Sequence, residues 1–166
     1  MAKKTDSFFV RATLEFDGAN FTQTTVDLGA FVDALGRSVL RIHNVDVQWG
    51  ENLQLTPAAN TDYGARMQLT TQTATQILSA SDKSIIATAH LAAAGGANSE
   101  VVMVSQDLDV APQNWRNGYL VGVESIYLGA HQNATAWGVG DVSVVLECTV
   151  ETLSEKAAMA LALSQQ

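Results

Sequence analysis

The chain has 166 residues, enough for one domain with a single core, and only 16% of them are charged, against about 25% in typical globular chains. Nine Lys and Arg against seventeen Asp and Glu give a formal charge of −8. Nucleic-acid-binding proteins concentrate positive charge, so this balance argues against a broad nucleic-acid interface. Lys3 and Lys4 form the only local basic cluster and predict a weak phosphate contact at most.

The distribution of apolar residues argues against two further classes of protein, those with a transmembrane helix and those with a secretory signal. No stretch approaches the roughly 18 consecutive apolar residues that a transmembrane helix needs. The first ten residues, MAKKTDSFFV, lack the apolar core of a secretory signal. We therefore expect a protein without a membrane span, made in the cytoplasm of its producer.

Eight segments have the composition of β-strands, with apolar and β-branched residues bounded by Gly, Pro, Asn or Asp. The clearest is FFVRATLEF, in which apolar and polar residues alternate. A segment with apolar residues at helical spacing, 28–35, predicts one or two helical turns, and the polar stretch 50–64 predicts a long loop. The predicted strands are 8–16, 21–26, 38–49, 66–73, 84–93, 100–108, 119–128 and 141–151.

The strand predicted at 38–49, SVLRIHNVDVQW, is long and changes its apolar face along its length. Leu40 and Ile42 share one parity, whereas Val45 and Val47 share the other. Because strand side chains alternate with a period of two, the change around His43 requires an inserted residue, a bend, or burial on both faces. Such strands suit a domain of two curved sheets.

Eight strands without recurrent helices predict an all-β, two-sheet antiparallel sandwich, most simply an eight-stranded single jelly roll. An immunoglobulin-like sandwich of seven or nine strands is the alternative. After the last strand, Thr152 and Glu155 have capping-box spacing before a run of helix formers, which predicts a short C-terminal helix. A helix this short is marginal alone, so it should dock on its own sandwich or on a neighbour. We expect a flexible N-terminal arm at 1–7, the jelly-roll sandwich at 8–151 and the helix at 152–166.

Motifs for catalysis or cofactor binding are not found in the sequence, so we predict no enzyme and no cofactor. The three histidines are far apart and occur in no metal-binding pattern. Asp107 and Asp109 at a strand end are weak Ca²⁺ candidates, and solvated acids are the simpler interpretation. Cys148 shares the apolar parity of its strand, which predicts a buried thiol.

Four residues are candidates for an interface. Loop tryptophans either stack on sugar rings or anchor contacts between subunits, where Trp is enriched. The predicted C-terminal helix at 152–166 contributes two leucines that lie on one side of it. The candidates are Trp115, Trp137, Leu153 and Leu161.

The order of elements, with VDLGAFVDALGRSVLRIHNVDVQW followed by a final DVSVVLECTVE, resembles the single jelly-roll coat proteins of small icosahedral viruses, particularly environmental and archaeal DNA viruses. The resemblance implies a structural subunit, many copies of which assemble into the shell of a virion, and other capsid proteins as partners. The long basic N-terminal arm of genome-binding coat proteins is not matched, since only Lys3 and Lys4 are basic there.

Two functions from different classes follow from the sequence. The first is a self-assembling major capsid subunit, made in the host cytoplasm and located in the virion. The alternative is a carbohydrate-binding jelly-roll module that uses Trp115 and Trp137, with Ca²⁺ near Asp107 and Asp109.

Overall fold

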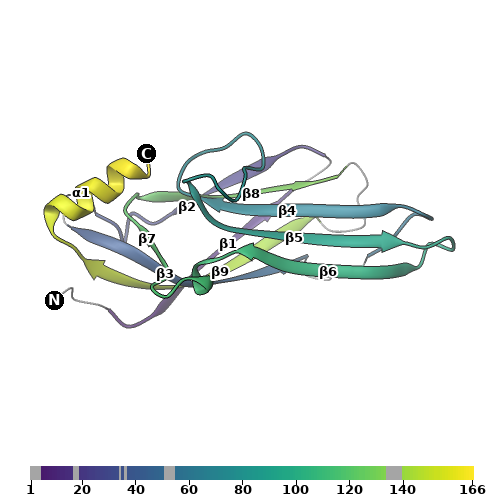
Figure 1. The fold of residues 1–166 in the computed structure, drawn as a ribbon, viewed down its shortest axis with the longest axis horizontal. Coiled ribbons are helices and arrows are strands. Elements are labelled where there is room, and N and C mark those ends of the chain that lie inside the picture. The colour runs from purple at the N-terminus through teal and green to yellow at the C-terminus, as the bar shows by residue number, and fades with distance from the viewer. Residues whose placement is uncertain (1–4, 17–18, 34, 36, 51–54, 134–139) are drawn as a thin grey trace.

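The computed structural model describes residues 5–16, 19–33, 35, 37–50, 55–133 and 140–166. These residues form two antiparallel sheets that face each other, with a short helix at one end of an elongated molecule (Figure 1). The chain is therefore an all-β sandwich, which confirms the predicted fold class.

The two sheets differ in width. The smaller sheet has four strands, in the order β1 (Phe8–Glu15), β9 (Asp141–Thr152), β3 (Ser38–Trp49) and β7 (Tyr119–Val121). The larger sheet has five, in the order β2 (Thr22–Asp27), β8 (Ser125–Gln132), β4 (Asp62–Thr70), β5 (Ile85–Gly95) and β6 (Val101–Val110). With β6 set aside, each sheet has four strands drawn alternately from the two halves of the chain, which is the jelly-roll arrangement.

The described part of the chain has nine strands, one more than expected, because the segment predicted as one strand at 119–128 divides in two. Tyr119–Val121 joins the smaller sheet and Ser125–Gln132 joins the larger one, so the chain crosses between sheets at 122–124. Gly122 lies at this crossing, where a Cβ would come within 3.0 Å of Leu161. This close approach leaves little room for a larger side chain at the corner between the two sheets.

β3 contains the predicted change of face. Its pairing with β9 shifts register between Ile42 and Asn44, so His43 is the inserted residue of a β-bulge. The bulge lets Leu40 and Ile42 on one side of it, and Val45 on the other, all reach the core with no exposed surface. His43 Nε2 lies 2.9 Å from Thr149 Oγ1 on β9, so the polar side chain at the bulge has a hydrogen-bond partner on the neighbouring strand.

The core lies between the two sheets and consists of their alternating inward side chains. β9 shows the pattern most clearly, because Val142, Val144, Leu146 and Cys148 have no exposed surface. Cys148 is therefore a buried thiol, as its parity predicts. Burial raises its pKa from 9.0 to about 12, and the neighbouring Glu147 acts in the same direction.

The helix α1 (Glu155–Ser164) packs on its own sandwich at the end that also holds residue 122. Ser154 is the N-cap and its Oγ accepts from Ala157 N, so the predicted cap at Thr152 is wrong; Thr152 is the last residue of β9. Ala158 and Ala162 are the buried residues of the helix. Just beyond it, the Gln165 side chain accepts from Gly122 N and donates to Leu120 O, which ties the helix end to β7.

Candidate functional site

The side chains that could take part in catalysis or metal binding are dispersed over the sandwich. Among the described residues, His, Cys, Asp and Glu side chains form no group of three that could hold a metal ion. No helix in the same part of the chain is long and apolar enough to span a membrane. Three surface features stand out: a carboxylate and histidine cluster, a polar pocket, and the outer edge of the larger sheet.

The predicted Ca²⁺ candidates lie on β6, beside a histidine of β5. His90 Nδ1 is 2.9 Å from Asp109 Oδ1, and His90 Nε2 is 3.8 Å from Asp107 Oδ2. Asp107 also accepts a hydrogen bond from Ser105 Oγ at 2.8 Å. The structure thus brings the two carboxylates together around an imidazole, which can form ion pairs with them when it is protonated.

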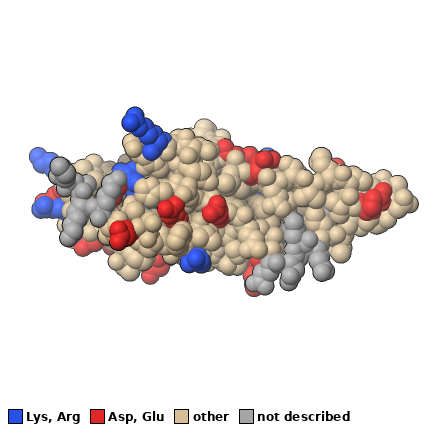
Figure 2. Space-filling model, turned by 90° about the horizontal axis from the view of Figure 1, so that it is seen from below, with Lys and Arg blue, Asp and Glu red and all other residues tan. Residues whose placement is uncertain are grey.

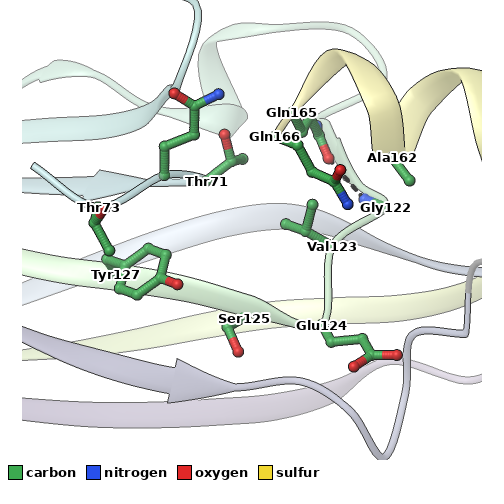
Figure 3. A pocket seen from close by; sticks show the side chains of 11 residues that line it. Thr71, Thr73, Gly122, Val123, Glu124, Ser125, Tyr127, Ala162, Gln165 and Gln166 are labelled. Carbon is green, nitrogen blue, oxygen red and sulfur yellow. Dashed lines mark hydrogen bonds between the residues drawn. The ribbon is translucent and has the colours of Figure 1, made fainter.

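A pocket of about 650 Å³ lies between the loop after β4, the crossing at 122–124 and the end of α1 (Figure 3). Its lining is mostly hydroxyl and amide groups, and the one carboxylate side chain, Glu124, points away from the helix end in this view. Thr71 Oγ1 is buried at this pocket and has no hydrogen-bond partner among the described residues. The described lining offers hydrogen-bonding groups but presents no pair of acid and base for catalysis.

The outer edge of the larger sheet is the most unusual surface of the molecule. β6 pairs with β5 on one side, and no described strand pairs with it on the other. Eight of its ten residues are exposed, although the strand is largely apolar. Its exposed large apolar side chains are Val101, Val102, Met103, Val104 and Leu108. Long apolar edge strands invite pairing with another strand, and proteins usually shorten, charge or cover them.

β6 also faces part of the smaller sheet across a groove. β7 pairs only with residues 40–42 of β3, so no described strand pairs with the outer edge of β3 beyond the bulge. There the Gln113 side chain accepts from Val45 N and donates to Val45 O, as a neighbouring strand would. A groove of about 300 Å³ lies between this part of β3 and the inner side of β6. Its lining residues are Asp46, Val47, Trp49, Ala89, Gln106, Asp107 and Leu108.

Charge is unevenly distributed on the side of the molecule seen from below (Figure 2). Lys and Arg side chains lie toward the end that carries α1, and the tapered end, where β5 and β6 turn, is mostly uncharged with a few acidic groups. β6 itself carries two Asp residues and no Lys or Arg.

The predicted interface residues lie at separate places. Trp115 follows the 3-10 helix η1 (Pro112–Asn114); it is 42% exposed, and its ring lies 6.0 Å from that of Tyr119. Leu153 and Leu161 are half-buried within their own chain, Leu161 against Gly122. Trp137, Lys3 and Lys4 lie outside the described residues. The β6 edge was not predicted as an interface, because an apolar segment such as VVMVSQDL is equally compatible with a strand inside a sheet.

No family model matches the chain. No curated protein matches it either. A solved structure from desmodium yellow mottle tymovirus is 13% identical, with a TM-score of 0.43, and the match covers 92% of this chain and 87% of that one. A structure from turnip yellow mosaic virus is also 13% identical, with a TM-score of 0.29, over 89% of this chain and 80% of that one.

Proposed function

We propose that the protein is a structural subunit, many copies of which assemble into the closed shell of an icosahedral virus. The observation that carries this proposal is exposed apolar surface on several separate elements. A closed shell requires each copy to use more than one contact surface, because a single two-fold contact stops at a dimer. The exposed large apolar residues are Phe9, Leu35, Val101, Val102, Met103, Val104, Leu108, Trp115, Met159 and Leu163.

These residues lie on elements that do not share one surface. Phe9 belongs to β1, an edge of the smaller sheet, whereas Val102 and its neighbours belong to β6, an edge of the larger sheet. Met159 and Leu163 lie on α1. A monomer would leave all of these side chains in water, where each forgoes the stabilisation that burial of apolar surface provides.

Further parts of the proposal follow from the resemblance of the sequence to jelly-roll coat proteins. The partners are other copies of this chain, together with other capsid proteins, and the finished location is the virion after synthesis in host cytoplasm. Contact with nucleic acid is confined to Lys3 and Lys4 and is weak at most. An environmental or archaeal DNA virus as the source stays a prediction of that resemblance.

Light scattering and electron microscopy of the purified full chain test the proposal. We expect closed particles of uniform size over some range of salt and pH. A strictly monomeric species across that whole range would overturn the proposal. The variant Phe9→Ser tests whether the exposed β1 edge contributes a contact between copies in the particle. Thr25→Ser, at an exposed position on β2, is its matched control.

A second candidate function, carbohydrate binding, is favoured by one observation. The exposed ring of Trp115 lies beside Tyr119, and exposed aromatic faces can stack on sugar rings. In this function Trp137 would join the surface and Ca²⁺ would bind near Asp107 and Asp109. Glycan-array binding that is lost in Trp115→Ala would support it. An array without signal, with Ca²⁺ and without it, would remove it.

A further inference from the structure

We infer that β6 pairs with the β6 strand of a second copy, antiparallel and across a two-fold axis at Gln106, to form a continuous ten-stranded sheet. The inference rests on the proposed self-assembly and names one of its contacts. It starts from the free edge of β6, whose backbone groups face no other described strand. A strand of this length and composition needs a partner more than the other three sheet edges do.

The other edges are shorter or more polar. β7 has three residues and β2 has six, of which four are Thr or Gln. β1 carries Arg11 and Glu15, and the Arg11 guanidinium covers the ring of Phe9 at 5.6 Å. β6 has ten residues and no Lys or Arg. Lysine on an edge strand is a common protection against pairing, and β6 lacks it.

A second copy fits this edge because of the way polar and apolar residues are arranged along it. A two-fold axis perpendicular to the sheet keeps the faces of both copies aligned, so residues of the same parity lie opposite each other. With the axis at Gln106, Val104 lies opposite the partner's Leu108, and Gln106 lies opposite its own copy. On the outer face, Ser105 lies opposite the partner's Asp107. Apolar groups then meet apolar groups on the inner face, and a hydroxyl meets a carboxylate on the outer face. Within β6, Met103 is the one apolar residue that opposes a charged one, the partner's Asp109.

Neighbouring registers and parallel pairing are less favourable. An axis at Ser105 would place Val104 opposite the partner's Gln106, Met103 opposite its Asp107 and Val101 opposite its Asp109. Three apolar side chains would then oppose polar ones, against one with the axis at Gln106. Parallel pairing in register would place Asp107 and Asp109 opposite their own copies, and like charges opposite each other destabilise a sheet. Antiparallel pairing avoids that opposition. It also brings the inner side chains of the partner's β6 next to the groove lined by Gln106 and Leu108.

Cysteine cross-linking of the full chain tests the inference. Residues directly opposite in an antiparallel pair have Cα atoms about 4.5–5.5 Å apart, which is within the range a disulfide can bridge. We expect Gln106→Cys to form a covalent dimer under mild oxidation, seen on a non-reducing gel. Thr25→Cys, on the β2 edge of the same sheet, is the matched control and should stay monomeric on that gel. Wild-type protein provides the baseline, because Cys148 is buried.

A mixture tests the register. Ser105→Cys and Asp107→Cys chains should cross-link more when mixed than either does alone, because only the mixture places the two thiols directly opposite each other. Val102→Lys should abolish the Gln106→Cys cross-link without loss of fold, since Val102 is exposed. Its matched control, Leu163→Lys, changes an exposed apolar residue of α1 and should leave the cross-link unchanged.

The outcomes separate this inference from the proposed function. Particles without cross-linking of Gln106→Cys above the Thr25→Cys level would overturn β6 pairing and leave the shell proposal standing. A cross-linked dimer from a protein that never forms particles would support β6 pairing and overturn the shell. Absence of both would overturn both.

Discussion

At the residue scale, Arg41 and Glu151 form the most buried ion pair of the described structure. Arg41 Nε and Nη2 donate to the two Glu151 carboxylate oxygens at 2.6 and 2.8 Å, and another Arg41 nitrogen donates to the Asn117 carbonyl. Only 3% of the Glu151 side chain is exposed. The hydrogen bond to Glu151 is the main reason why the pKa of Arg41 is raised above its ordinary value. The pair joins β3 to β9 beside β7.

Removal of one partner of this ion pair should destabilise the folded chain. We expect Arg41→Met to lower the free energy of unfolding by about 3 kcal/mol, because it leaves the Glu151 carboxylate buried without its guanidinium. The double variant Arg41→Met with Glu151→Leu should recover most of that loss, since it buries no charge. Urea denaturation of the wild type, the two single variants and the double variant measures both effects. Equal stability of the wild type and Arg41→Met would show that the pair contributes nothing.

Cys148 predicts a pH dependence at the alkaline end. Its pKa is raised from 9.0 to about 12 in the folded chain, so the folded form keeps the proton that the unfolded form releases above pH 9. The thiol therefore stabilises the fold fully below pH 9, and this contribution is lost as the pH rises toward 12. Between pH 8 and 11, we expect the unfolding free energy of the wild type to fall about 2 kcal/mol more than that of Cys148→Ala. Parallel losses in the two proteins would contradict this.

At the element scale, the structure and the sequence pattern place the N-cap of α1 at different residues. The N-cap is Ser154 in the structure, whereas the capping-box pattern starts at Thr152. Ser154→Ala should lower the free energy of unfolding by about 1 kcal/mol, because it removes the acceptor for Ala157 N at the first turn of α1. Thr152→Ala, at the capping-box position of the sequence, is the matched control and should have a smaller effect. Thermal unfolding measures both, and a larger effect of Thr152→Ala would restore the sequence-based cap.

At the scale of the whole molecule, the net negative charge of each copy should make assembly depend on the salt concentration. Each copy carries a formal charge of −8, so copies repel one another as they approach. Salt screens this repulsion, with a Debye length of about 10 Å at 0.1 M and 3 Å at 1 M. We therefore expect the assembled fraction, measured by light scattering, to rise between low and high salt. Assembly that weakens as salt is added would mean that attractive ion pairs, rather than apolar contacts, hold the copies together.

Much of the fold could be predicted because its signals are local. The bounds of β3 coincide with the predicted strand, and its apolar parity locates the bulge at His43. The alternation in β1 and β9 likewise identifies the buried faces, since a strand with one face in the core must alternate. The predicted start of β4 at 66 was four residues late, because polar Asp62 and Gly64 give no strand signal although both pair with β5.

Other features required the tertiary structure, because they depend on what lies opposite a residue rather than on the residue itself. The sequence alone determined an all-β sandwich, a bent central strand, a buried Cys148 and a C-terminal helix, all of which follow from side-chain periodicity and helix propensity. Only the folded structure decided that 119–128 turns a corner at Gly122, that His90 joins Asp107 and Asp109, and that the apolar β6 ends its sheet with a free edge. An apolar strand has the same composition at the centre of a sheet as at its edge, so strand order, set by long-range pairing, made β6 a candidate interface.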